Sequence, residues 1–117
     1  MPLTAYAPGD LERYRRHEQS VPFSTIIVAG VYVYVQDCAG IVWVGPDGPH
    51  MHPRVLGGAR PATAAGELTL AANGEVLLIN NLSGTFRCHP DSLLLAVGGI
   101  IAQGGRCLAD AITRYEV

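Results

Sequence analysis

Hydrophobic and polar residues alternate most clearly over residues 24–36, which read STIIVAGVYVYVQ. The second half of this run alternates aliphatic and aromatic side chains, which predicts a strand with one face of each kind: Val31, Val33 and Val35 against Tyr32 and Tyr34. Gly30, in the middle of the run, indicates a bulge or a close backbone approach. Residues 37–40 then form a turn, and the apolar run 41–44 is the predicted hairpin partner.

A second hairpin is predicted over residues 62–79. An alternating strand at 62–70 and an apolar strand at 75–79 flank Asn73-Gly74, and both turn residues tolerate the positive φ of a tight hairpin. The loop that follows is rich in side chains that can form hydrogen bonds: Asn80, Asn81, Ser83, Thr85, Arg87 and His89. Such a loop is typical of a binding site, but also of an ordinary protein surface.

The N-terminal part of the chain predicts a short helix. Asp10 can cap it over residues 11–19, and Pro22 would end it. Residues 1–8 contain two prolines and are expected to be an extended lead-in. The basic residues here alternate with acidic ones, so they fit a solvated face of this helix: Arg13, Arg15 and Arg16.

A longer helix is predicted over residues 92–103. Pro90 opens it and Gly104-Gly105 ends it. Each internal glycine, Gly98 and Gly99, costs about 1 kcal/mol relative to alanine, so close packing on the sheet should compensate. The apolar side chains at helical spacing are expected to make that packing: Leu93, Leu94, Val97, Ile100 and Ile101. Residues 109–117 would return as a last strand.

The predicted order of elements is helix, two strands, a long irregular loop over residues 45–60, two strands, helix and strand. This order is typical of an α+β domain with a mostly antiparallel sheet covered by helices. The pattern contains no internal repeat, linker or second domain, so residues 1–117 are predicted to form a single domain.

Composition narrows the possible partners. The chain is 49% hydrophobic and only 15% charged, which favours a protein partner or self-association. A net charge of −2 argues against a nucleic-acid binder, which usually carries a basic stripe. All eight basic residues are arginine, which suggests a GC-rich bacterial genome and excludes lysine Schiff-base or Walker-type chemistry.

The sequence gives no sign of export or membrane insertion. The first ten residues lack the basic start and apolar run of a signal peptide, and the apolar run 93–102 is too short to span a bilayer. A cytoplasmic protein without membrane contact is therefore expected. Export by a signal-independent route would leave no such mark.

Metal and cofactor sites are not expected. Cys38, Cys88 and Cys107 are widely spaced, with no zinc-type cluster, and fit reduced thiols. His50 and His52 could chelate a metal if extended, but the third ligand would have to come from elsewhere, with three candidates: Asp47, Glu67 and His89. Loop histidines that bind no metal are the favoured interpretation, and no cofactor motif occurs.

The candidate site residues lie around the second hairpin. Glu67 is a candidate general base, unless its face of the strand is open to solvent, and His52 is the second catalytic candidate. Arg87 could hold a carboxylate or phosphate, or bridge the loop backbone or Glu67. Three further loop residues complete the predicted ligand-binding set: Asn81, Ser83 and Thr85.

Four short motifs occur in order within residues 50–105: HPRVLGG at 52–58, AAGE at 64–67, NG at 73–74 and SGTFR at 83–87. In order and spacing they resemble a module in the conserved part of plant IQ-motif (calmodulin-binding) proteins, with related segments in bacterial proteins, some of them large and toxin-like. Where that module has Ser-Gly-His-Tyr-x-Pro, this chain has Thr85 in place of His, Phe86 in place of Tyr, and the proline displaced to Pro90. The resemblance therefore implies the fold more than catalysis, and it implies no reaction.

These features favour two hypotheses about function. The favoured hypothesis is a small cytosolic binding or accessory module of a bacterium, such as an immunity-type partner in a toxin system. The alternative is a small transferase or hydrolase acting on a nucleotide-like anionic substrate. It requires His52, Glu67 and Arg87 to converge within about 8 Å around one pocket. A third possibility is self-assembly through the Tyr32/Tyr34 face.

Overall fold

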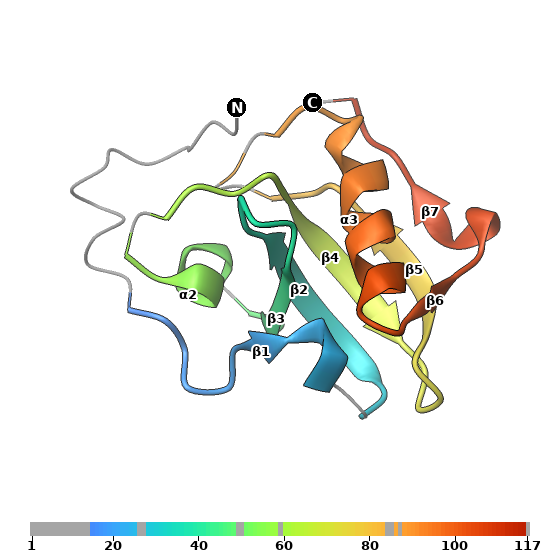
Figure 1. Cartoon of the computed structure of the whole chain (residues 1–117), viewed down its shortest axis with the longest axis horizontal. Coiled ribbons are helices and arrows are strands. Elements are labelled where there is room, and N and C mark those ends of the chain that lie inside the picture. Colours follow the sequence, from blue (N-terminus) through green and yellow to red (C-terminus); the bar gives the residue numbers. More distant parts are fainter. Residues whose placement is uncertain are drawn as a thin grey trace.

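The computed structural model describes residues 15–25, 28–48, 51–58, 60–83, 86 and 88–116. Its elements follow one another in the order seen in Figure 1: β1 (Val21–Pro22), η1 (Phe23–Thr25), β2 (Gly30–Gln36), β3 (Val42–Pro46), α2 (His52–Leu56), β4 (Ala64–Leu70), β5 (Glu75–Asn80), α3 (Ser92–Ala102), β6 (Arg106–Cys107), η2 (Ala109–Ala111) and β7 (Ile112–Thr113).

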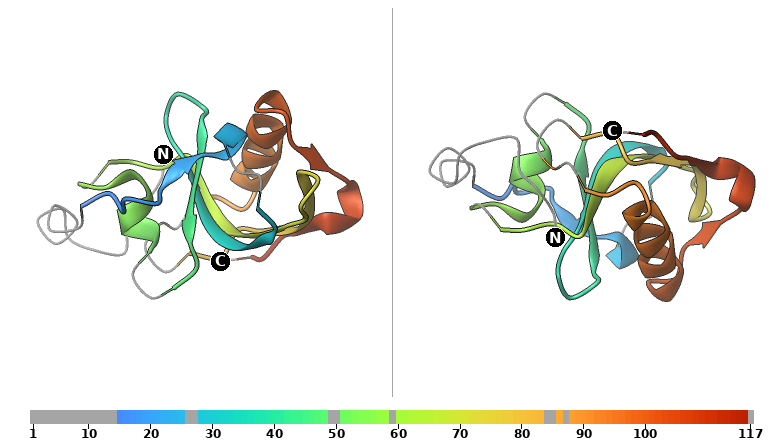
Figure 2. Two further views of the ribbon diagram at one scale, coloured as in Figure 1. Left: turned by 90° about the horizontal axis from the view of Figure 1, so that it is seen from below. Right: turned by 90° about the horizontal axis from the view of Figure 1, so that it is seen from above.

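The strands form one curled sheet in the order β1-β3-β2-β4-β5-β6, and β7 also pairs with β5. The pairings from β1 to β5 are antiparallel, whereas β6 and β7 both lie parallel to β5. The prediction of a single α+β domain is therefore confirmed. The sheet is mixed, however, and dominates the fold, because only two helices, the short α2 and α3, lie against it in the described residues (Figure 2).

Both faces of the sheet are packed, because successive residues of β2 enter different apolar clusters. Tyr34 is fully buried in the cluster that α3 covers, and its hydroxyl donates to the Asn80 carbonyl oxygen at 2.8 Å. Val33 and Val35 lie in the cluster that α2 covers. The predicted division of β2 into two faces is therefore confirmed. An oligomer interface built on Tyr32 and Tyr34 is wrong, since Tyr34 has no exposed surface.

Both predicted hairpins are present. β2 pairs with β3, and β4 pairs with β5 through the turn at Asn73-Gly74. Gly74 has φ +83°, which favours glycine, and the turn is closed where Ala71 N–H donates to the Glu75 carbonyl at 2.9 Å. This hairpin aligns Glu67 and Asn80 on neighbouring strands and so positions much of the candidate site.

α3 matches the predicted helix in extent but buries fewer side chains than expected. Leu93, Val97 and Ile100 lie in the core beside Ala96, whereas Leu94 and Ile101 are exposed, so their predicted packing on the sheet is wrong. An eleven-residue helix on one face of a sheet can turn only one stripe inward, and almost every position of α3 is apolar.

Four segments differ from their predicted structure. Residues 15–19 form no helix, because His17 N–H donates to the Arg54 carbonyl and the Arg16 guanidinium lies 5.5 Å from the Trp43 ring centroid; residues 11–14 are outside the described part. The strand expected over 24–36 begins only at Gly30, after η1. The loop over 45–60 contains α2, and the last strand shrinks to β7.

Candidate functional site

His52 and Glu67, the two catalytic candidates, lie close to each other on α2 and β4. His52 Nε2 is 2.8 Å from the Gly66 carbonyl oxygen, and burial lowers its pKa against the opposing influences of that carbonyl, Glu67 and Asp47. A neutral imidazole that donates Nε2–H to Gly66 accounts for this geometry. The Nε2 nitrogen is thus occupied by the backbone.

The Glu67 carboxylate is also engaged. Its Oε1 accepts from Asn80 Nδ2 at 3.1 Å, while Asn80 Oδ1 accepts from the backbone N–H groups of Glu67 and Leu82 at 3.0 Å each. Asn80 therefore ties β4 to the start of the loop after β5. These bonds stabilise the hairpin. Glu67 itself is half-buried, so its face of the strand is not fully open to solvent.

The predicted ligand-binding residues divide into two groups. Asn81 is buried and binds the C-terminal segment, with Nδ2 donating to the Tyr115 carbonyl at 2.8 Å and Oδ1 accepting from Tyr115 N–H at 2.7 Å. Ser83 Oγ accepts from Phe86 N–H at 3.1 Å, so this hydroxyl already has a backbone partner. Thr85 and Arg87 lie outside the described residues, so the convergence of Arg87 with His52 and Glu67 stays a prediction.

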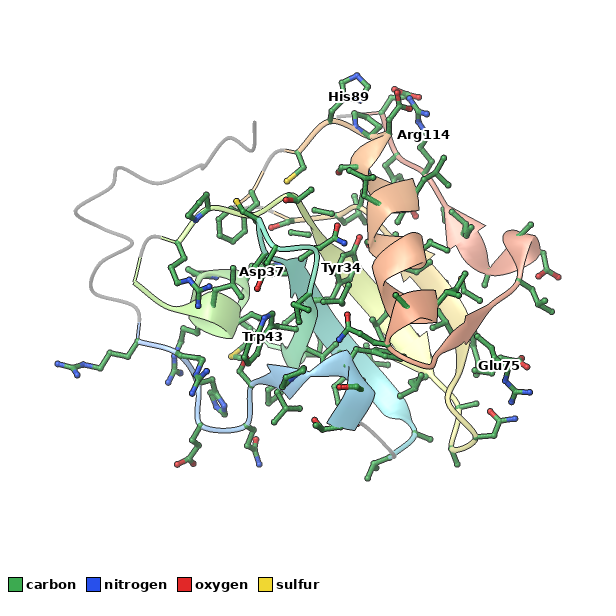
Figure 3. The ribbon with its side chains drawn as sticks, viewed as in Figure 1. Tyr34, Asp37, Trp43, Glu75, His89 and Arg114 are labelled. Carbon is green, nitrogen blue, oxygen red and sulfur yellow. The ribbon has the colours of Figure 1, made fainter. Side chains whose placement is uncertain are left out.

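A cavity of about 510 Å³ opens at the N-terminal end of α3, within the usual size range of small-molecule pockets. It is lined by Cys38, Thr63, Cys88, His89, Asp91, Ser92 and Leu95. The sequence did not single out this place, because its lining comes from three separate stretches of the chain. His89 and Arg114 lie at the same end of α3 (Figure 3), where Arg114 pairs with Asp91.

Two polar side chains of the cavity wall, Cys88 and Ser92, are buried. Burial raises the pKa of the Cys88 thiol to about 11, so this cysteine stays protonated at neutral pH. Ser92 is only 8% exposed, and its hydroxyl has no hydrogen-bond partner among the described residues. Within the same residues, no group of three or more metal-ligating side chains occurs; His50 lies outside them.

A different kind of surface lies along the solvent side of α3. Leu94, Leu95 and Ile101 are 63%, 57% and 54% exposed, and an added Cβ at Gly98 would meet nothing within 4 Å. Together with Ala102, which is also exposed, they form what we call the outer face of α3. No charged residue occurs from Ser92 to Gly105.

Sequence reasoning placed two members of this outer face in the core. A signal was present, since Leu93, Leu94 and Leu95 are consecutive and cannot all point to one side of a helix. This signal was not recognised because α3 has no charged residue, so no change from apolar to polar side chains distinguishes its solvent side from its buried side.

No helix in the described ranges combines the length and apolar character that crossing a membrane requires. Compared with protein-family models, with curated proteins and with solved structures, the chain matches none of them.

Proposed function

We propose that this chain is a small protein-binding accessory module, and that the outer face of α3 is its binding surface. One observation supports the proposal above others. Three large aliphatic side chains on an uncharged helix are each more than half exposed to water. Contiguous apolar surface of this kind marks interaction sites on soluble proteins, because its burial is favourable at about 25 cal/mol per Å².

The shape of this surface favours a protein partner. A helix side is convex, whereas small ligands are bound in concave pockets that surround them. Interface centres are poor in charged residues, and the outer face of α3 contains none. The resemblance of residues 50–105 to segments in toxin-associated bacterial proteins makes such a protein one class of partner to test.

The enzyme alternative has less support. It needs His52 and Glu67 to be free for proton transfer, whereas His52 Nε2 is bonded to the Gly66 carbonyl and Glu67 accepts from Asn80. Neither residue lines the cavity at the end of α3.

A site-specific photo-cross-linker tests the proposal. A benzophenone amino acid at Leu94 should form a discrete adduct with another polypeptide in the producing cell. The same probe at Glu116, which is exposed at the end of the described chain, should form none. The captured protein, identified and purified, should bind the wild type and lose about 30-fold in affinity with Leu94→Asp, the effect of removing about 2 kcal/mol at an interface centre.

The contrary outcome is equally clear. If probes at Leu94, Leu95 and Ile101 all fail to cross-link while the protein remains folded, the outer face of α3 is not a binding surface and the proposal is wrong.

A further inference from the structure

We propose that four arginines on the α2 side of the molecule bind an acidic segment of another polypeptide. These residues, which we call the arginine cluster, are Arg15, Arg16, Arg54 and Arg60. This surface is separate from the outer face of α3, because α2 and α3 cover opposite faces of the sheet.

The fold brings arginines from distant parts of the sequence together. His17 N–H donates to the Arg54 carbonyl at 2.8 Å, and Ser20 Oγ donates to the Val55 carbonyl at 2.5 Å. The segment before β1 is therefore held against α2. The Arg54 side chain adds to this contact, with Nε donating to the Arg15 carbonyl at 3.3 Å, so these two arginines are neighbours although 39 positions separate them.

The end of α2 adds the other two arginines. A Cβ on Gly57 would lie 2.5 Å from the Arg16 nitrogen, so only glycine lets the chain after α2 pass this close. Arg60 N–H donates to the Gly57 carbonyl at 3.4 Å. The backbones of Arg16 and Arg60 thus both contact this one glycine.

The positive charge of the arginine cluster is not neutralised within the described residues. Three of its members are exposed and Arg54 is half-buried. Every ion pair in the described part of the chain contains Asp91 or Arg114, and Glu18, exposed on the same segment as Arg15, forms none of them. Like charges held close together repel, so a bound anion would recover free energy that their assembly costs.

Two of the guanidinium groups are already held in place. Arg54 Nε is bonded to the Arg15 carbonyl, which leaves the N–H groups of its two terminal nitrogens for a ligand. The Arg16 guanidinium lies over the Trp43 ring, 5.5 Å from its centroid. Guanidinium groups bind carboxylates through paired N–H groups, and groups that are already oriented lose less entropy on binding.

Charge outside the arginine cluster favours an acidic polypeptide segment over nucleic acid. The rest of the sequence carries ten acidic residues against four arginines, so a long polyanion would meet repulsion beyond the cluster. Nucleic-acid surfaces also present aromatic rings to the bases, whereas Arg16 covers the Trp43 ring. A short run of aspartate and glutamate needs only the cluster itself.

Fluorescence anisotropy with a fluorescein-labelled glutamate peptide of about eight residues tests the proposal, since such a peptide is long enough to span the arginine cluster. The wild type should bind it. Raising the NaCl concentration from about 50 to about 300 mM should weaken binding at least about 10-fold, because salt screens exposed charges. A glycine–serine peptide of the same length should not bind.

Single arginines then locate the surface. Arg15→Gln and Arg60→Gln should each weaken peptide binding about 2- to 5-fold, and together about 10-fold, because each removes one exposed charge. Both side chains are exposed, so the variants should remain folded. Arg106→Gln is the matched control: Arg106 is exposed as well but lies on β6, three strands from β2, so its substitution should change binding less than about 2-fold.

Three results would overturn the proposal. The first is a folded wild type that does not bind the glutamate peptide at about 50 mM NaCl. The second is an equal loss of binding in Arg106→Gln and in the cluster variants. The third is a single-stranded oligonucleotide of equal length that binds more tightly than the peptide and is weakened by Arg15→Gln, which would assign the cluster to nucleic acid.

The outer face of α3 is tested separately. Leu94→Asp should change peptide binding less than about 2-fold, since Leu94 lies on the opposite side of the sheet from α2. Failure of the peptide to bind therefore leaves the proposed function standing, and failure of the cross-linking at Leu94 leaves the arginine cluster standing.

Discussion

At the scale of single residues, glycines show how one residue type serves different needs in this chain. A Cβ on Gly66 would lie 2.0 Å from the Asn80 carbonyl oxygen, which already accepts from the Tyr34 hydroxyl, so only glycine fits between them. A Cβ on Gly99 would lie 2.8 Å from Gln36 Nε2, so this glycine lets α3 approach the sheet. Gly98, one residue earlier, faces open space.

The two neighbouring glycines of α3 should therefore respond in opposite directions to alanine. Gly98→Ala should raise the free energy of unfolding by about 0.5–1 kcal/mol, because alanine is the better helix former and nothing blocks its methyl group. Gly99→Ala should lower it by about 1–3 kcal/mol through overpacking against Gln36 and Gly40. Urea unfolding of both variants and the wild type measures these changes.

His52 should make stability depend on pH. Burial lowers its pKa in the folded protein, so between that value and the unfolded pKa of about 6.5 the unfolded chain binds more protons. Stability is then fully present above pH 6.5 and falls as the pH drops below it, by at most about 1.4 kcal/mol per pH unit.

His52→Gln supplies the control, since glutamine keeps an N–H for the Gly66 carbonyl but does not titrate. Urea unfolding of both proteins at pH 7.5, 6.5 and 5.5 should show a slope for the wild type that is reduced in the variant. Equal slopes would assign the pH dependence to other groups.

At the scale of elements, the turn between β2 and β3 depends on one buried carboxylate. Asp37 Oδ1 accepts from the N–H groups of Ala39 and Ile41 at 2.9 and 3.0 Å, and Oδ2 accepts from Trp43 Nε1 at 3.1 Å. This side chain thus joins the turn to the aromatic ring that packs on the α2 side of the sheet. Figure 3 shows Asp37 and Trp43 in this region.

Asp37→Ala should lower the free energy of unfolding by about 3 kcal/mol, because three donors lose a charged acceptor. Asp37→Asn should cost less, about 1–2 kcal/mol, since one amide oxygen still accepts from the two backbone N–H groups. Asp110→Ala, at an exposed position, should change stability by less than about 0.5 kcal/mol. Thermal and urea unfolding check all three, and equal costs for the two Asp37 variants would contradict this account.

Elements with strong local signals could be predicted from the sequence. Valine–tyrosine alternation predicted β2, Asn73-Gly74 predicted the second hairpin, and Pro90 with Gly104 predicted the limits of α3. Residues 15–19 could not be predicted, because a distant partner, the Arg54 carbonyl on α2, decides their path. The orientation of the parallel β6 and β7 likewise depends on where the chain returns after α3.

The candidate site could be predicted only in part. The enzyme alternative required His52 and Glu67 to be close, but no sequence pattern determined their distance; they are neighbours because His52 on α2 reaches the Gly66 carbonyl beside Glu67. The hydrogen bonds between Asn81 and Tyr115 join residues 34 positions apart, and sequence pattern carries no information about such pairing. The cavity at the end of α3 could not be predicted either, because its lining residues also lie far apart in the sequence.

At the scale of the whole molecule, the described fold is a sheet with an apolar cluster on each of its two faces. The larger apolar cluster lies under α3, and the smaller one, to which Phe86 belongs, lies under α2. Both sheet faces are filled, and three of the ten large apolar side chains that are exposed in the described residues lie on the outer face of α3. A chain with 49% hydrophobic residues in so small a domain leaves some of them at the surface, and α3 holds several of the largest.

Leu95 belongs both to the outer face of α3 and to the wall of the cavity beside its first turn. A polypeptide that packs on α3 and a small molecule that enters the cavity would therefore touch the same side chain. Two such binding events are thermodynamically linked: by whatever factor the first changes the affinity of the second, the second changes that of the first. Any displacement of Leu95 by a molecule in the cavity would therefore alter the surface that α3 presents to a polypeptide.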